Sequence, residues 1–208
     1  MSEIILASKS PRRFELLSMT GLSFEVKDAH VDEDVIVNEI LSSSPELSAS
    51  SDLPPMYGKA EKICCALARA KAAAVLEKTG EPDTIVLGSD TVVVTEDEIL
   101  GKPKDEEDAR RMLRELSGRT HRVYTGVAIL GKGKNRIFSS WADVKFHGLD
   151  DLQQSLIESY IASGSPMDKA GAYGIQDTGS LLIDSIFGDY YAVVGLPAAK
   201  VYREIVRF

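Results

Sequence analysis

The segment IILASKSPRRFELL, residues 4–17, predicts a strand, a turn and a helix in quick succession. The first four of these residues are apolar, which is typical of a short buried strand. Ser10 and Pro11 indicate a helix start, because Ser is a favoured N-cap and Pro is favoured at the first helical position. Gly21 is the predicted end of that helix. The chain is therefore expected to begin with a compact strand–turn–helix unit.

The first turn of this helix carries two arginines, Arg12 and Arg13. Cations at a helix start oppose the helix dipole and cost about 0.3–1 kcal/mol each. Two guanidiniums beside free backbone N–H groups favour an anion-binding site instead. The alternative is an ordinary strand–turn–helix whose arginines point into solvent.

The composition is that of an ordinary globular protein, with 44% hydrophobic and 27% charged residues among 208. The net charge of −8 argues against nucleic-acid binding through bulk positive charge, but it is compatible with a local basic pocket. No apolar run approaches the ~20 residues that span a membrane, and no basic segment of a secretory signal is seen. We therefore expect a cytoplasmic protein without membrane or nucleic-acid partners. The adjacent Cys64 and Cys65 fit small core residues in a reducing compartment.

Helical and extended patterns are mixed along the rest of the chain, which favours an α/β or α+β fold around one long mixed sheet flanked by helices. We expect a single domain, 1–208. Strands are predicted at residues 24–27, 84–94, 122–130 and 136–146, with a further hairpin at 181–186 and 190–194. Helices are predicted at residues 57–78, 105–117 and 150–162, and after Pro197. The predicted loops are an acidic one at 28–34, a Ser/Pro-rich insertion at 41–55 and a loop at 166–177.

Asp90 lies inside the most apolar strand of the chain. A carboxylate there is costly to bury unless it is paired, hydrogen-bonded or bound to a metal. Gly88 allows another group to approach the backbone closely, and Gly88 to Asp90 predict an interruption of the strand. The alternative is an Asp that is satisfied locally at a bulge or strand end.

Other candidate residues each have an ordinary alternative. Lys102 lies on a rigid turn, where a solvated lysine is the alternative, and residues 168–176 suit a ligand-hugging loop or a flexible connector. Lys71, among alanines, is a candidate cation of the site. The alternative is a lysine whose aliphatic part lies on the apolar face while its ammonium reaches solvent. Glu33 could bind a divalent cation or belong to a solvated acidic loop. The three histidines lack the spacing of metal ligands: His30, His121 and His147.

The scattered cations and carboxylates share one chemical theme, a polyphosphate with a divalent ion. The chain has no G-x-x-x-x-G-K-[ST] motif, so it is not a P-loop protein. It also has no G-x-S-x-G motif and no nucleophile paired with a histidine, so acyl transfer is unsupported.

Six segments, in order between residues 4 and 200, resemble the signatures of the Maf family, the septum-formation-protein homologues. They are LASKSPRRFELL, LARAKA, LGSDTVV, GKPKDEEDARRMLRELSGRTHRVYTGVA, DKAGAYGIQ and VVGLP. The resemblance implies an α/β fold similar to inosine triphosphate pyrophosphatases, with a ligand cleft between two lobes and often a homodimer. It also implies hydrolysis of a nucleoside triphosphate to the monophosphate and pyrophosphate. The expected ion is Mg²⁺, with Mn²⁺ or Co²⁺ as alternatives.

The resemblance also implies roles for single residues. Asp90 matches the proposed proton acceptor of the family and, together with Glu33, the metal ligands. The positions around the phosphates match Ser8, Arg13, Lys71, Lys102 and Lys169. The branch that prefers dTTP and UTP is matched by Arg12, Thr91 and Gln176, where the branch acting on 7-methyl-GTP usually has Trp, Gln and Glu. Modified pyrimidine nucleotides are further expected substrates.

Two departures from the family pattern affect these assignments. Bacterial relatives commonly carry an acidic residue where this chain has Ala70, and the insertion at 41–55 separates Glu33 from Lys71. The sequence predicts attack of water at the α-phosphorus, with Asp90 as the base. A non-catalytic nucleotide-binding regulator of cell division and a nucleotide phosphomonoesterase are the alternatives.

Overall fold

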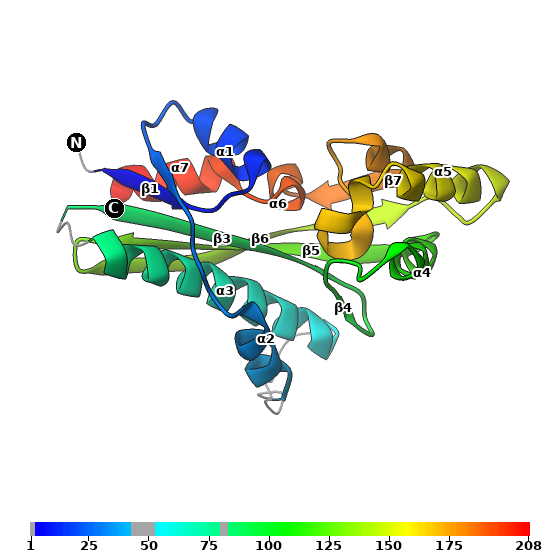
Figure 1. Cartoon of the computed structure of the whole chain (residues 1–208), viewed down its shortest axis with the longest axis horizontal. Helices are drawn as coiled ribbons and strands as arrows, with labels where there is room; N and C mark the ends of the chain where they lie inside the picture. The colour runs from blue at the N-terminus through cyan, green and yellow to red at the C-terminus, as the bar shows by residue number, and fades with distance from the viewer. Residues whose placement is uncertain (1–2, 43–52, 80–82) are drawn as a thin grey trace.

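The computed structural model describes residues 3–42, 53–79 and 83–208. Within these ranges the chain forms a seven-stranded mixed sheet in the order β2-β1-β3-β5-β6-β7, with β4 beside β3 (Figure 1). The strands are β1 (Ile4–Ala7), β2 (Glu25–Lys27), β3 (Ile85–Val94), β4 (Ile99–Leu100), β5 (Thr120–Gly131), β6 (Lys134–Phe146) and β7 (Ile183–Gly188). Strand β1 runs parallel to β2 and β3, and the other neighbours are antiparallel. The predicted fold, a long mixed sheet flanked by helices, is confirmed.

Helices cover both faces of this sheet (Figure 1). The α-helices are α1 (Pro11–Ser18), α2 (Glu33–Ser42), α3 (Pro55–Thr79), α4 (Glu106–Leu116), α5 (Asp151–Ala162), α6 (Tyr190–Val194) and α7 (Ala198–Arg207). Three short 3-10 helices lie between α5 and β7: η1 (Ser165–Asp168), η2 (Ala170–Ala172) and η3 (Thr178–Leu182). No helix in the described ranges is both long enough and apolar enough to cross a membrane.

The alternation of side chains along β3 separates two cores. Val86 packs against α3 together with Ala68 and Ala72, whereas Leu87 packs on the opposite face with residues of α1, α6 and α7. A third core lies toward the other end of the long strands and joins α4, α5 and the 3-10 helices around Phe146. Successive residues of β3 therefore point alternately toward α3 and toward the helices on the opposite face of the sheet.

Three sequence-based predictions of local structure are wrong. Residues 33–34 open helix α2 instead of belonging to a loop, because the Asp32 carboxylate accepts the backbone N–H of Val35 at 3.3 Å at the helix start. Residues 190–194 form helix α6 instead of a strand, because Asp189 caps it by accepting the N–H of Tyr191 at 3.0 Å. Strand β3 also continues through residues 88–90 without an interruption.

The predicted insertion at 41–55 lies mostly outside the described residues, which omit 43–52. Its edges belong to helices, since α2 ends at Ser42 and α3 begins at Pro55. The predicted loop at 166–177 contains η2 and most of η1.

Candidate active site

The candidate site begins with a gap in strand pairing along one edge of β3. Strand β1 pairs with β3 at residues 85–87, and β4 pairs with it at 93–94. Among the described strands, none pairs with residues 88–92 on that edge, while β5 pairs with the other edge throughout. An unpaired stretch between two bracketing strands leaves the backbone groups on that edge without a strand partner, as a ligand site requires. Asp90 lies at the middle of this gap.

Helix α3 supplies the partner of Asp90. A Cβ atom at Gly88 would collide with the backbone of Ala68 on this helix, so glycine lets α3 lie directly on the strand. The close approach expected at Gly88 is therefore made by a helix. One turn further along, Lys71 reaches Asp90, and its Nζ donates to Oδ1 at 2.6 Å.

Asp90 is only 8% exposed as a residue, and its carboxylate belongs to a triad of charges. The Lys71 ammonium contacts both Asp90 Oδ1, at 2.6 Å, and Glu33 Oε1, at 2.8 Å. Burial raises the pKa of Asp90 above its ordinary value, although the positive charges of Lys71 and Arg13 act in the opposite direction. A carboxylate with a raised pKa is a better proton acceptor than an ordinary aspartate when it is ionised.

Arg13 enters the site from the first turn of α1, where Ser10 caps the helix by accepting the Arg13 N–H. Its guanidinium turns back to the sheet: Nε donates to the Gly195 carbonyl at 3.0 Å and Nη1 to Ser8 Oγ at 3.4 Å. Burial lowers the pKa of Arg13, and the nearby negative charge of Asp90 raises it. The alternative that both arginines point into solvent is wrong for Arg13.

A directed chain of hydrogen bonds fixes Thr91. The Arg13 Nη2 donates to Thr91 Oγ1 at 3.3 Å, and Thr91 Oγ1 lies 2.8 Å from Thr125 Oγ1. The Thr125 hydroxyl has one proton, which it donates to the Ala192 carbonyl at 2.6 Å. Thr91 must therefore donate to Thr125, so its own proton is not available to a ligand.

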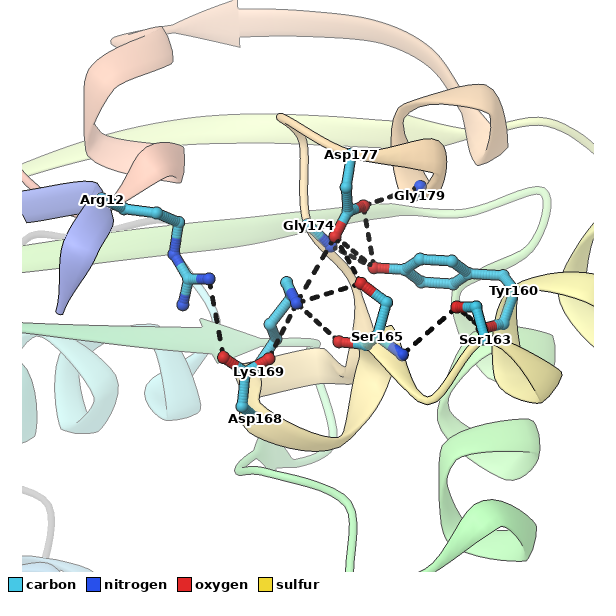
Figure 2. A network of polar contacts seen from close by, with 9 residues as sticks. All are labelled: Arg12, Tyr160, Ser163, Ser165, Asp168, Lys169, Gly174, Asp177 and Gly179. Carbon is cyan, nitrogen blue, oxygen red and sulfur yellow. Dashed lines mark hydrogen bonds and ion pairs between the residues drawn. The ribbon is translucent and has the colours of Figure 1, made fainter. Parts of the chain in front are cut away.

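Two of the remaining predicted residues, Arg12 and Lys169, lie at the segment that follows α5 (Figure 2). Arg12 faces Asp168, with its Nη1 3.7 Å from the carboxylate, and Lys169 contacts Asp168 at 2.7 Å. Gln176 and Lys102 are exposed. The turn carrying Lys102 is tied to this segment, because the Gly171 N–H donates to the Gly101 carbonyl at 3.0 Å.

The structure thus brings together six of the predicted residues around the gap in β3: Ser8, Arg13, Glu33, Lys71, Asp90 and Thr91. Sequence reasoning missed Gly195, which accepts from Arg13, and Thr125, which holds Thr91. The VVGLP segment, which contains Gly195, was one of the six segments of the family resemblance, but no role was predicted for this glycine. The buried hydroxyl of Thr125 gave no signal. Ser89 Oγ lies 3.0 Å from the Gly126 carbonyl and 3.1 Å from the Gly195 carbonyl, so its single proton has two acceptors.

Glu33 and Asp90 are the carboxylates available to the divalent cation that the resemblance implies. Glu33 and Asp90 each place an oxygen against the same Lys71 ammonium, so the two carboxylates converge. The described residues contain no group of three or more His, Cys, Asp or Glu side chains suited to a metal. Mg²⁺ in nucleotide enzymes is usually held by one or two carboxylates plus substrate phosphates and waters. The residues present fit an ion of that kind, completed by substrate.

The fold and the site together define an α/β protein that concentrates cations around one buried carboxylate, an arrangement suited to a phosphorylated ligand. The chain belongs to the family described as Maf-like protein, whose model matches residues 3–208. A Bacillus cereus protein named dTTP/UTP pyrophosphatase is 46% identical over 208 residues, covering 100% of this chain and 96% of the relative. A Bacillus thuringiensis subsp. konkukian protein of the same name is 45% identical with the same coverage. The resemblance inferred from the six segments is confirmed.

Proposed function

We propose that this protein hydrolyses nucleoside triphosphates, dTTP and UTP foremost, to the nucleoside monophosphate and pyrophosphate. The observation that carries the proposal is Asp90, a buried carboxylate with a raised pKa beside two cations in the strand gap. The names of relatives that match the whole chain support the same activity and the same substrates. Modified pyrimidine nucleotides are further candidate substrates.

The reaction begins with a water molecule oriented by Asp90. The carboxylate accepts the water proton as the oxygen attacks the α-phosphorus, and the bond to the oxygen bridging the α- and β-phosphorus breaks. Pyrophosphate leaves with the electron pair of that bond. Lys71 holds the carboxylate in place through its 2.6 Å contact, so the base cannot rotate away from the substrate.

Cationic groups offset the negative charge of the triphosphate. Arg13 is oriented by its hydrogen bonds to Gly195, Ser8 and Thr91, and its guanidinium is assigned to the phosphates. Fixed cations of this kind stabilise developing charge without having to reorganise. Lys102, exposed on its turn, is proposed to join the phosphates when the substrate binds.

Mg²⁺ is the proposed cofactor, with Mn²⁺ or Co²⁺ as alternatives. Glu33 and Asp90 would hold it, and the bound ion would polarise phosphate oxygens as a Lewis acid. Lys71 contacts both carboxylates and offsets part of the repulsion between them before substrate arrives.

Base selection is assigned to Gln176 and Arg12. The Gln176 amide offers both a donor and an acceptor, which suits the O4 and N3–H edge of uracil or thymine. Thr91 has its proton committed to Thr125, so it presents a methyl group and an acceptor to the base instead of a donor. We further expect a cytoplasmic enzyme, where nucleotide pools are found, and a homodimer.

The released product tests the proposal. Purified protein is incubated with dTTP, UTP, CTP, ATP and GTP in the presence of Mg²⁺, and pyrophosphate and orthophosphate are measured separately. Pyrophosphate from dTTP and UTP supports the proposal, and an excess of EDTA should abolish its release. Orthophosphate alone would indicate a phosphomonoesterase. Binding of nucleotide without either product would indicate a non-catalytic regulator.

A further inference from the structure

The carboxylate of Asp177 organises the segment that follows helix α5 (Figure 2). It accepts three hydrogen bonds, from the Tyr160 hydroxyl at 2.9 Å, from Ser165 Oγ at 2.9 Å and from the Gly179 N–H at 2.8 Å. Burial alone would raise the pKa of Asp177, but these hydrogen bonds outweigh it and lower the pKa. The carboxylate therefore stays ionised and ties α5, η1 and η3 to one point.

Lys169 is drawn into the same cluster. Its ammonium donates to the Ser165 carbonyl at 2.5 Å, to Asp168 at 2.7 Å and to Ser165 Oγ at 3.4 Å, and it forms an ion pair with Asp177 Oδ2 at 3.4 Å. An ammonium has three N–H donors, and the three hydrogen bonds account for them. The Lys169 side chain is only 11% exposed. A lysine in this state is enclosed by protein acceptors instead of being held open for a phosphate.

Gly174 makes room for the ion pair. A Cβ atom at Gly174 would lie 2.7 Å from both Lys169 Cε and Asp177 Oδ2, closer than packed atoms come. The Gly174 N–H also donates to the Tyr160 hydroxyl at 3.0 Å, and that hydroxyl in turn donates to Asp177. Gly174 in DKAGAYGIQD is thus accounted for by contacts within the protein.

Both residues proposed to read the base are attached to this cluster. Gln176 directly precedes Asp177 in the chain, and its side chain is exposed. Arg12 reaches the cluster from α1 through Asp168, which contacts both Arg12, at 3.7 Å, and Lys169, at 2.7 Å. Displacement of Lys169 or loss of the Asp177 charge would therefore move Gln176 and release the partner of Arg12.

We propose that Lys169 and Asp177 form an ion-paired clasp that positions Gln176 and Arg12. Lys169 and Asp177 are then positioning residues for base selection. This inference rests on the proposed function and changes the role expected for Lys169, which was matched to a phosphate-binding position. The rival is direct contact between Lys169 and the triphosphate. The two hypotheses predict different effects of substitution. If Lys169 and Asp177 form a clasp, substituting either residue should have the same effect. If Lys169 binds phosphate, substituting Asp177 should not reproduce the effect of substituting Lys169.

A double-mutant cycle separates them. Lys169→Met, Asp177→Asn and the double variant are compared with wild type in kcat and KM for UTP and CTP. The clasp predicts that each single variant reduces the preference for UTP over CTP about tenfold, mainly through KM. The double variant should be no worse than the worse single variant, since coupled residues are not additive. Lys169→Arg, which keeps the ion pair, should retain the preference.

Inorganic tripolyphosphate, which has no base, provides the second readout as a competitive inhibitor. The clasp predicts an unchanged inhibition constant in both single variants. A tenfold weaker inhibition in Lys169→Met but not in Asp177→Asn would overturn the clasp in favour of phosphate binding. An unchanged base preference in Asp177→Asn would overturn it as well. Asp184→Asn, at an exposed carboxylate paired with Lys145, is the matched control that should resemble wild type.

A measurement of nucleotide binding tests the clasp independently of the proposed enzymatic activity. Thermal protection of each folded variant by UTP and by CTP is measured alongside turnover. If wild type releases no pyrophosphate, the proposed function fails, and the clasp is then judged by whether the variants lose the difference in protection. Wild-type protection that is equal for UTP and CTP would itself overturn the clasp.

Discussion

The acid–lysine pair of Asp90 and Lys71 and the clasp of Lys169 and Asp177 are both charged clusters, but they are built from different structural materials. The first joins the middle of a ten-residue strand to a 25-residue helix. The second is assembled from 3-10 helices and turns held by one carboxylate. Groups on long regular elements are fixed by the core beneath them, whereas groups on turns depend on their own hydrogen bonds. We therefore expect chemistry to depend on the first cluster and selectivity on the second.

The largest effect should follow from Asp90→Asn, which keeps the shape of the side chain and removes the base. Turnover of UTP should fall by about 100- to 10,000-fold, the usual contribution of a general base. Nucleotide binding, measured by thermal protection, should survive. Asp97→Asn, in an exposed turn, is the control and should match wild type. Wild-type turnover in Asp90→Asn would remove the base from the mechanism and break the comparison.

The next effect is on stability and follows from Lys71→Met. Both side chains of the pair are 12% exposed, so the variant leaves a buried carboxylate without its nearest cation. Breaking a buried ion pair costs about 3–5 kcal/mol. The free energy of unfolding in urea should fall by about that amount and recover in part in Lys71→Met with Asp90→Asn, where the charge is gone. A double variant less stable than Lys71→Met would contradict the pairing.

A smaller and selective effect is expected from Gln176→Glu. The carboxylate cannot donate to the O4 of a pyrimidine. The preference for one base over another should therefore change about tenfold, which corresponds to roughly 1.4 kcal/mol. The fold and the turnover of the best substrate should be less affected. Initial rates over the five nucleotides provide the measurement, with the melting temperature as the folding control. An unchanged ranking would exclude Gln176 from base selection.

The difference between the two clusters also explains which features the sequence could predict. Asp90 was identifiable because a carboxylate is out of place among the β-branched residues of β3, and Lys71 because it interrupts a run of alanines. Nothing local showed that Asp177 accepts a hydrogen bond from Tyr160, 17 positions earlier. Helix α6 was mistaken for a strand because its apolar residues are typical of both, and a single cap at Asp189 decided between them.

The hydroxyl chain behind Arg13 offers a milder test of how the first cluster is positioned. Thr125→Val keeps the volume but removes the acceptor of Thr91 and the donor to Ala192. Arg13 should become less well oriented, and KM for UTP should rise several-fold with little change in kcat; the lost buried hydrogen bond would cost about 1–3 kcal/mol of stability. Thr125→Ser, which retains the hydroxyl, should restore the KM. A kcat effect without a KM effect would place Thr125 outside the binding of phosphate.

The smallest expected effect concerns His121, which lies in the core beneath the second cluster. It is fully buried, its Nε2 contacts the Tyr173 hydroxyl at 2.8 Å, and its Nδ1 has no partner among the described residues. Burial lowers the pKa of His121 from 6.5 to about 3, against a weak opposite effect of Asp143. Between these values the unfolded chain binds a proton that the folded chain does not. Stability should therefore decrease as the pH falls below 6.5, by at most about 1.4 kcal/mol per pH unit from this group.

His121→Phe isolates that contribution, because phenylalanine preserves the edge-to-face packing against Phe146 and Tyr173 and cannot be protonated. The variant should be less stable than wild type at pH 7, since the Tyr173 hydroxyl loses its partner. The stability difference should shrink as the pH is lowered, because only wild type pays to keep an imidazole neutral. Urea unfolding at pH 7, 6 and 5 provides the measurement. If the free energy of unfolding of wild type and of His121→Phe changed with pH in parallel, protonation of His121 would not contribute to stability. The contrast between the two clusters would then concern catalysis and selectivity alone.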